Sequence, residues 1–229
     1  MKKLVVFSGA GMSAESGLKT FRDSGGLWEE YDIYKVATPE AFEKDPELVL
    51  KFYNMRRAQL ANAEPNEAHI GVASLEEKYS VDVVTQNVDD LHERAGSTRV
   101  LHLHGELRKV RSVKNPDLRK DIAYKDIKLG DLAEDGGQWR PDVVWFGEAV
   151  PMMDSAIAKV AQADILVIIG TSLNVYPAAG LASVAGQNCK KYLIDPNADG
   201  INVSKDVFLI NEKAGTGMSR LLEILNRGF

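Results

Sequence analysis

The feature that most constrains the fold is a series of short apolar runs, each ending in a polar or glycine-rich turn. Seven recur along the chain: KLVVFSGAG, VDVVTQNVD, RVLHLHGE, PDVVWFGE, DILVIIGTS, KYLIDPN and DVFLIN. Their apolar residues are consecutive rather than alternating, which is typical of strands buried on both faces of a parallel sheet. Helical stretches separate them, at residues 46–61, 65–79, 153–163 and 217–227. The sequence predicts an α/β fold with a doubly wound parallel sheet and right-handed crossovers.

Two parts of the chain depart from this alternation. Residues from about 27 to 79 carry two or more helices without a strand, and residues 108–139 are polar and charged. With 229 residues, the chain is long enough for a main domain with a smaller one attached. We predict a small domain built from residues 29–79 and 108–139. The main domain then takes residues 1–28, 80–107 and 140–229.

Composition and charge argue against several classes of function. The chain has 28 Lys and Arg against 33 Asp and Glu, and its net charge of −5 gives no sign of a nucleic-acid or acidic-membrane surface. No apolar run approaches the roughly 18 residues that span a bilayer, and the N-terminus reaches glycine too early for a signal peptide. We expect a cytoplasmic monomer without nucleic-acid or membrane partners. The single cysteine, Cys189, excludes an internal disulfide and any CxxC site.

The first strand leads into a glycine-rich turn, in which Gly9, Gly11 and Ala14 form a G-x-G-x-x-A pattern. Such a turn lets backbone N–H groups approach a pyrophosphate, as in Rossmann-like dinucleotide-binding folds, although a plain strand-to-helix turn is the alternative. A dehydrogenase would continue to a second strand with an acidic residue about 20 positions on. Here TFRDSGGLWEEYD follows instead. We therefore expect a long loop whose Phe21, Arg22 and Trp28 cover the nucleotide.

Five motifs stand in a fixed order along the chain: GAGMSAESGLKTFR, TQNVDDLHERAG, HLHGEL, RPDVVWFGE and GTSLNVYPAAG. Together they resemble the sirtuin family of NAD-dependent protein deacylases, especially its bacterial members, with a weak match only over residues 108–139. The resemblance implies an enzyme that consumes NAD as a co-substrate. In that reaction the acyl oxygen of an acyl-lysine protein or peptide attacks the ribose carbon that bears nicotinamide. The expected products are nicotinamide and O-acyl-ADP-ribose.

A histidine at a strand end is the candidate general base. His104 lies directly before Gly105, and the ordinary histidine pKa of about 6.5 suits proton transfer at neutral pH. His102 points to the same sheet face and competes with it, and a purely structural histidine is a third possibility. The family's His-Gly pair selects His104 as the catalytic residue. We expect His92 to be structural and His69 to lie on a helix surface.

The resemblance also implies the residues that hold NAD. Gln86, Asn87 and Asp89 follow a strand, and their amide and carboxylate groups suit ribose hydroxyls and a carboxamide. Asp89 can also cap the following helix. The full expected set is Gly9, Ala10, Gly11, Met12, Ser13, Ala14, Glu15, Phe21, Arg22, Trp28, Gln86, Asn87, Val88, Asp89, Gly170, Thr171, Ser172, Asp195, Pro196, Asn197 and Ala214.

Two segments concern the acyl-lysine. In the family the peptide adds a strand between VVWFGE and GTS, so we expect contacts from Val144, Phe146 and Gly147. Tyr53 and Arg56 lie three residues apart on one face of a helix. They resemble the Tyr-x-x-Arg pair of sirtuins that remove succinyl and malonyl groups, in which the pair binds the acyl carboxylate. A solvated helix face, with Arg56 and Arg57 as surface charges, is the alternative.

These features predict a deacylase that removes succinyl, malonyl and acetyl groups from protein lysines. One alternative is an enzyme that is mainly a deacetylase. Another is an NAD or ADP-ribose-binding protein with weak ADP-ribosyl transfer. A dehydrogenase is disfavoured because the acidic strand end is missing.

Most sirtuins carry two cysteine pairs for structural zinc between HGEL and RPxVVWFGE. Here Ser112 and Asn115 stand where the first pair would be, no second pair exists, and all four histidines lie elsewhere. Because tetrahedral structural zinc needs four Cys or His ligands, we predict no metal. Apolar packing must then replace it, and the candidates are Val110, Val113, Leu118, Ile122, Tyr124, Ile127, Leu129, Leu132 and Trp139.

Overall fold

Six parallel strands form the main sheet in the computed structural model, which describes residues 1–20 and 30–227. In spatial order they are β3 (Val100–His102), β2 (Ser80–Thr85), β1 (Lys3–Ser8), β7 (Ile165–Ile169), β8 (Lys190–Ile194) and β9 (Val207–Ile210). The direction in which strands are added reverses between β1 and β7. The predicted doubly wound α/β fold is therefore confirmed.

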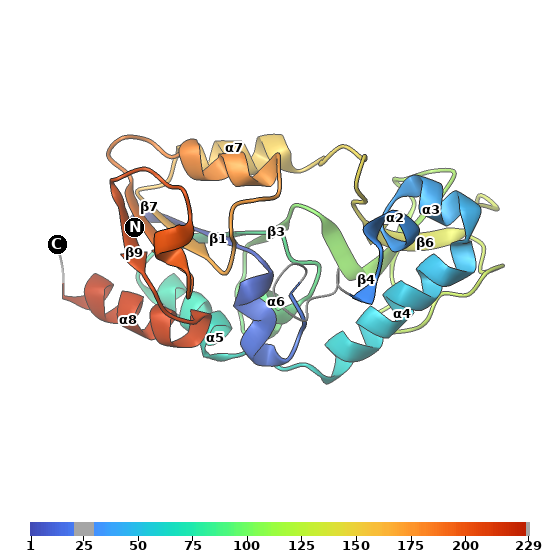
Figure 1. The fold of residues 1–229 in the computed structure, drawn as a ribbon, viewed down its shortest axis with the longest axis horizontal. Coiled ribbons are helices and arrows are strands. Elements are labelled where there is room, and N and C mark those ends of the chain that lie inside the picture. The colour runs from blue at the N-terminus through green and yellow to red at the C-terminus, as the bar shows by residue number, and fades with distance from the viewer. Residues whose placement is uncertain (21–29, 228–229) are drawn as a thin grey trace.

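Helices cover both faces of this sheet (Figure 1). One face packs against α5 (Glu67–Ser74) and α8 (Ala214–Asn226), and the other against α7 (Met153–Ala161) and the 3₁₀ helix η3 (Ala178–Ser183). Neighbouring residues of one strand point to different cores, as Leu4 and Val5 do in β1. The apolar runs are continuous because both faces are buried.

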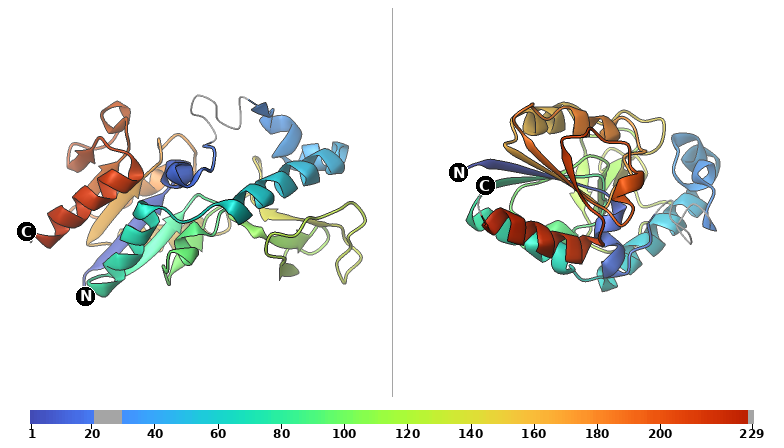
Figure 2. Two further views of the ribbon diagram at one scale, coloured as in Figure 1. Left: turned by 90° about the horizontal axis from the view of Figure 1, so that it is seen from below. Right: turned by 60° about the vertical axis from the view of Figure 1, so that its left-hand side comes forward.

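A second, antiparallel sheet lies beside the first and has the order β5 (Arg119–Asp121), β4 (Gly105–Ser112), β6 (Trp139–Val143). Three helices cover it: α2 (Ile33–Val36), α3 (Pro39–Lys44) and α4 (Pro46–Asn62) (Figures 1 and 2). The side chains of Thr38 and Asp45 cap α3 and α4, each just before a proline at the first helical position. The shorter elements are η1 (Ala10–Ser16), η2 (Leu75–Glu77), α6 (Leu91–Arg94) and η4 (Ala198–Gly200).

One strand prediction was wrong. PDVVWFGE contributes β6 to the small antiparallel sheet, not a strand to the parallel sheet. Its apolar residues Val143 and Trp145 pack in a cluster with Val49 and Phe52 of α4. RVLHLHGE is also divided, because β3 ends at His102 and β4 begins at Gly105. A short apolar run is equally compatible with either sheet, so only the long-range packing decides between them.

The packing bears on the domain boundaries. Ala68 and Val72 of α5 pack in the core of the main sheet, although α5 falls within residues 29–79. Strand β4 crosses the expected boundary between residues 107 and 108. We propose that the small domain instead lies between about Val36 and Ala63 and between Gly105 and Glu148.

The buried position of α5 also corrects an expectation about its histidine. His69 is fully buried, not on a helix surface, because the side of α5 that carries it faces α6. Its ring meets that of His92 edge-on, with the centroids 5.0 Å apart.

The small apolar core consists of only part of the set predicted for it. Val110, Ile127 and Trp139 are buried with Leu50 of α4, and Leu118 and Ile122 pack against them. Tyr124 packs instead against the neighbouring cluster around α4. The other three residues are 45–59% exposed because they lie in the connections outside the three strands of the small sheet, which corrects the prediction for Val113, Leu129 and Leu132.

None of the helices in the described residues is both long enough and apolar enough to cross a membrane.

Candidate active site

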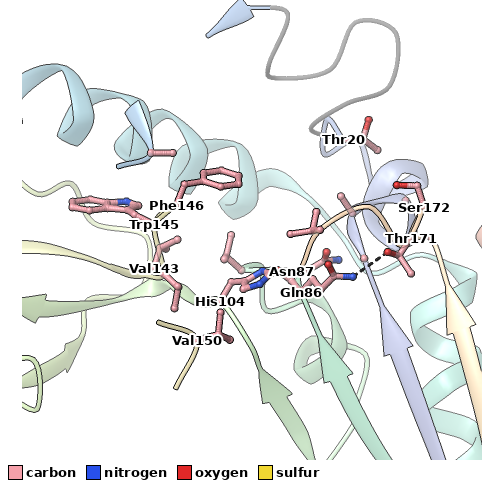
Figure 3. A pocket seen from close by; sticks show the side chains of 18 of the residues that line it. Thr20, Gln86, Asn87, His104, Val143, Trp145, Phe146, Val150, Thr171 and Ser172 are labelled. Atoms are coloured by element: carbon pink, nitrogen blue, oxygen red, sulfur yellow. Dashed lines mark hydrogen bonds between the residues drawn. The ribbon is translucent and has the colours of Figure 1, made fainter. Parts of the chain in front are cut away.

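The candidate site lies at the carboxyl ends of the parallel strands, around the point where the strand order reverses. A cavity of about 370 Å³ opens there. Figure 3 shows Gln86, Asn87 and His104 between Trp145 and Phe146 on one side and Thr171 and Ser172 on the other. The predicted residues that line the cavity are Gly9, Ala10, Gly11, Tyr53, Arg56, Gln86, Asn87, Val88, His104, Val144, Phe146, Gly147, Gly170, Thr171, Ser172, Asp195 and Asn197.

The other predicted residues that the structure describes do not line this cavity. Met12 is buried in the core of the main sheet. The Glu15 carboxylate accepts a hydrogen bond of 2.8 Å from the Gly215 N–H, which joins the first turn to α8 beside Ala214. Ser13, Ala14, Asp89 and Pro196 likewise fall outside the lining, and Phe21, Arg22 and Trp28 lie outside the described residues.

The glycines of the first turn are required by close packing. A Cβ on Gly9 would lie 2.7 Å from the Thr171 Cβ, and one on Gly170, whose φ is +61°, would lie 2.1 Å from the Met12 nitrogen. The Gly11 N–H donates to the Gly170 carbonyl at 2.9 Å. The turns after β1 and β7 therefore touch backbone to backbone, a reason for glycine that adds to the expected approach of a phosphate.

Polar side chains beneath the cavity hold its amides in place. The Asn87 Nδ2 donates to Ser13 Oγ at 3.1 Å, and that hydroxyl donates to Asp89 Oδ2 at 2.9 Å. The Gln86 Nε2 donates to Thr171 Oγ1 at 3.0 Å (Figure 3). Asp89 also accepts from the first N–H of α6, that of Leu91, and burial raises the pKa of its carboxyl. Asp89 thus supports the start of α6, whose N-cap residue is Asp90, and its expected contact with NAD stays a prediction.

His104 lies where the chain passes from one sheet to the other. Its Nδ1 is 3.1 Å from the Gln86 carbonyl oxygen. A carbonyl can only accept, so Nδ1 carries the hydrogen and the neutral ring has its lone pair on Nε2. Burial lowers the pKa of His104 below its ordinary value, although the hydrogen bond to Gln86 opposes this shift. The imidazole is therefore neutral at pH 7 and can accept a proton.

Both ring nitrogens of the competing histidine, His102, have hydrogen-bond partners. His102 Nδ1 is 2.9 Å from the Asn87 carbonyl oxygen, and its Nε2 is 2.8 Å from Glu93 Oε1. His102 does not line the cavity. Glycine after His104 is needed because Gly105 has a φ of +78° and a Cβ there would lie 1.9 Å from the Asp142 carbonyl oxygen.

Tyr53 and Arg56 are buried on the side of α4 that faces the cavity, with 5% and 7% of their surfaces exposed. The alternative of a solvated helix face is therefore wrong, because the small sheet and the segment after β6 cover α4. Burial lowers the pKa of Arg56, and the nearby Asp89 opposes this shift. Arg57 is fully buried but does not line the cavity, and its Nη1 donates to Asn54 Oδ1 at 2.7 Å.

An ion-pair network next to the cavity was not predicted. Glu148 pairs with Arg140 at 2.7 Å and with Arg111 at 2.9 Å, and it accepts from the Trp145 N–H at 2.8 Å. Burial alone would raise the pKa of Glu148, but these donors hold it below its ordinary value. Arg111 and Arg140 face each other across β4 and β6. Only that pairing could have indicated a shared acidic partner, and the sequence did not reveal it.

The region of residues 108–139, for which we predict no metal, contains a hydrogen-bonded cluster. The Ser112 hydroxyl donates to the Asp135 carboxylate at 2.8 Å, and the same carboxylate accepts from the Gly137 N–H at 2.8 Å. Within the described part of the chain, no group of three or more His, Cys, Asp or Glu side chains could hold a metal ion. The absence of zinc stays a prediction.

A family model described as the Sir2 family matches residues 9–177, three-quarters of the chain. The chain belongs to the Sir2 family. Among curated relatives, the NAD-dependent protein deacylase of Helicobacter pylori is 56% identical over 97% of this chain and 96% of its own length. The protein of the same name from Bacteroides thetaiotaomicron is 51% identical over 98% of both chains. Among solved structures, a Sir2 homologue in complex with NAD has a TM-score of 0.86 and 41% identity, covering 99% of this sirtuin and 90% of that chain.

Proposed function

We propose that this chain, an NAD-dependent protein deacylase of the Sir2 family, removes succinyl and malonyl groups as well as acetyl groups from protein lysines. The products would be nicotinamide and O-acyl-ADP-ribose. The observation that carries the acyl preference is the buried pair Tyr53 and Arg56 in the wall of the cavity that His104 also lines.

The pair fits a carboxylate. A guanidinium stays charged in proteins, and one buried in a cavity wall favours an anion that can accept paired N–H bonds. The phenol of Tyr53 adds a neutral donor, since burial raises its pKa and keeps it protonated. A hydrogen bond to a charged group contributes about 1.5–3 kcal/mol, so the pair favours succinyl over a neutral acyl group by about one to two orders of magnitude. It does not exclude acetyl-lysine.

The cavity residues fit a dinucleotide that crosses the carboxyl ends of the strands. Asp195 and Asn197 follow β8 and would hold the adenosine ribose, and Gly9 to Gly11 would lie against the phosphates. Gln86 and Asn87 follow β2 and would contact the nicotinamide end. When bound, NAD supplies the ribose carbon that receives the acyl oxygen. His104 would accept the proton of a ribose hydroxyl at Nε2, since its Nδ1 is committed to Gln86.

The peptide would lie along Val144 to Gly147. The N–H groups of Val144, Trp145 and Phe146 already donate to His104, Glu148 and Ala37. Strand addition on this segment would therefore depend mainly on its carbonyl groups and on Gly147. Because such recognition uses the main chain of the peptide, we expect the enzyme to accept acyl-lysines in many different sequence contexts.

The test is kcat/KM on one peptide sequence that carries succinyl-lysine or acetyl-lysine. We expect Arg56→Met to lower the succinyl-to-acetyl ratio of kcat/KM by about ten- to a hundredfold, because a charge-assisted bond is lost. The matched control is Arg57→Met, which removes an equally buried charge from the same helix outside the cavity and should keep the ratio. An equal loss on both substrates in Arg56→Met would refute the carboxylate role.

A further inference from the structure

A buried hydrogen bond joins the two segments expected to meet the acyl-lysine. The Trp145 indole N–H donates to the Tyr53 hydroxyl oxygen at 2.9 Å. Both residues are almost fully buried, and both line the cavity. Tyr53, which with Arg56 would bind the acyl carboxylate, is thus connected to the segment that follows β6.

The indole is fixed on its other sides as well. The Arg140 guanidinium lies over its ring, 3.2 Å from the centroid, and the Phe42 ring lies 5.3 Å away. Glu148 binds both Arg140 and the backbone N–H of Trp145. Because the backbone and the ring of Trp145 are both held, the direction of its indole N–H is set by the fold.

This direction constrains the Tyr53 hydroxyl. A phenol hydrogen prefers the plane of the ring and therefore has two favoured orientations. The oxygen accepts from Trp145 on one side, so its own hydrogen cannot occupy that side. The hydroxyl hydrogen points away from the indole, and Tyr53 is prepared to donate to a ligand.

We propose that Trp145 is a positioning residue for acyl specificity, whose indole N–H orients the Tyr53 hydroxyl to donate to the carboxylate of a succinyl or malonyl group. The proposal rests on the proposed function, in which Tyr53 and Arg56 bind that carboxylate. Arg56 supplies the positive charge. The indole N–H of Trp145 excludes the orientation in which the Tyr53 hydroxyl hydrogen would point away from the carboxylate.

A double-mutant cycle tests this role. Trp145→Phe keeps an aromatic ring against Arg140 and Phe42 but removes the N–H. We expect it to lower the succinyl-to-acetyl ratio of kcat/KM by about two- to tenfold, the effect of one neutral hydrogen bond. In a Tyr53→Phe background the same substitution should cause no further drop, because the hydroxyl that it orients is gone.

The control is Trp139→Phe, which makes the same change at a tryptophan packed in the neighbouring core and should keep the ratio. An unchanged ratio in Trp145→Phe, while Tyr53→Phe lowers it, would overturn the role of Trp145 and leave the proposed function intact. An equal drop in both backgrounds would also overturn it, since the effect would not pass through Tyr53. If Tyr53→Phe and Arg56→Met both keep the ratio, the proposed function fails, and the role of Trp145 fails with it. Should Trp145→Phe not fold, benzothienylalanine at position 145 removes the N–H with the bicyclic shape retained.

Discussion

The environment of His104 leaves one of its two ring nitrogens able to accept a proton. Its position between the sheets brings Nδ1 to the Gln86 carbonyl, which fixes the tautomer. Partial burial lowers the pKa, so the ring is unprotonated at neutral pH. His102, two residues earlier, makes hydrogen bonds with both nitrogens. Two residues of the same type, on the same run of sequence, thus differ in what they can do.

We predict that His104→Ala lowers kcat for deacylation by about 10² to 10⁴, the usual effect of removing a general base. Nicotinamide release and loss of the acyl group from a peptide are the measurements. His102→Asn serves as the comparison and should lower kcat far less than His104→Ala does, because His102 does not line the cavity. Unchanged deacylation by His104→Ala would show that the base is another group.

At the scale of elements, the small sheet depends on contacts between segments far apart in the sequence. Ser112 at the end of β4 is buried and donates to Asp135, which precedes β6 by a few residues. The Lys114 N–H donates in turn to the Ser112 oxygen at 3.1 Å. These bonds close the long connection between β4 and β6, which in most sirtuins is the place of the zinc cysteines.

We predict that this connection is stabilised by hydrogen bonds and packing rather than by a metal. Ser112→Ala should lower the Tm, because the Asp135 carboxylate and the Lys114 N–H both lose a partner. A strong chelator should leave the Tm and the activity of the wild type unchanged. Stoichiometric zinc in the purified protein, measured by elemental analysis, would contradict this prediction.

At the scale of the whole molecule, a buried histidine pair lies between the main sheet and the helices that cover it. His92 of α6 lies 3.0 Å from Ser8 Oγ at the end of β1, and Ser8 donates to Thr85 in β2. His69 of α5 packs edge-on against His92. Burial lowers the pKa of His69 to about 4 and that of His92 well below its ordinary value. Both rings are therefore neutral in the folded protein.

We predict that the folded state loses stability as the pH falls below about 6.5, the ordinary histidine pKa. Between that value and the lowered folded pKa, the unfolded chain binds more protons than the folded one, so the free energy of unfolding decreases with decreasing pH. For each of the two histidines, the free energy of unfolding decreases by up to about 1.4 kcal/mol for each unit by which the pH falls in this range. Urea unfolding at pH 7.0, 6.0 and 5.0 measures the slope.

The control for this slope is a variant whose residue at position 69 cannot titrate. His69→Gln should be less stable than the wild type at pH 7, but its free energy of unfolding should decrease less steeply between pH 6.5 and pH 5. An identical slope in the variant would assign the acid sensitivity to other groups. His102 acts in the opposite sense. Burial would lower the pKa of His102, but the hydrogen bond with Glu93 raises this pKa on balance. The contribution of His102 to the stability of the folded state is therefore present at low pH and lost as the pH rises.

The α/β class and the main helices could be predicted from the sequence because they depend on local patterns. The helices expected at residues 46–61 and 153–163 occur as α4 and α7, within two residues at each end. Gly9, Gly11, Gln86, Asn87 and His104 also line one cavity, as their positions after predicted strands suggested, while their roles toward NAD stay predictions. In a parallel sheet the carboxyl ends of the strands meet at one edge, so residues in such positions are brought together by the fold class alone.

The sequence by itself thus determined the α/β class, the family and several residues that line the cavity, because local periodicity and short motifs encode them. Tertiary structure alone decided which sheet β6 joins, that His69 is buried, and that Arg56 lies in a cavity wall while Arg57 does not. It also decided the connection from Glu148 through Arg140 and Trp145 to Tyr53. The physical reason is that burial, tautomer and pKa depend on neighbours contributed by distant segments, and no local pattern specifies those neighbours.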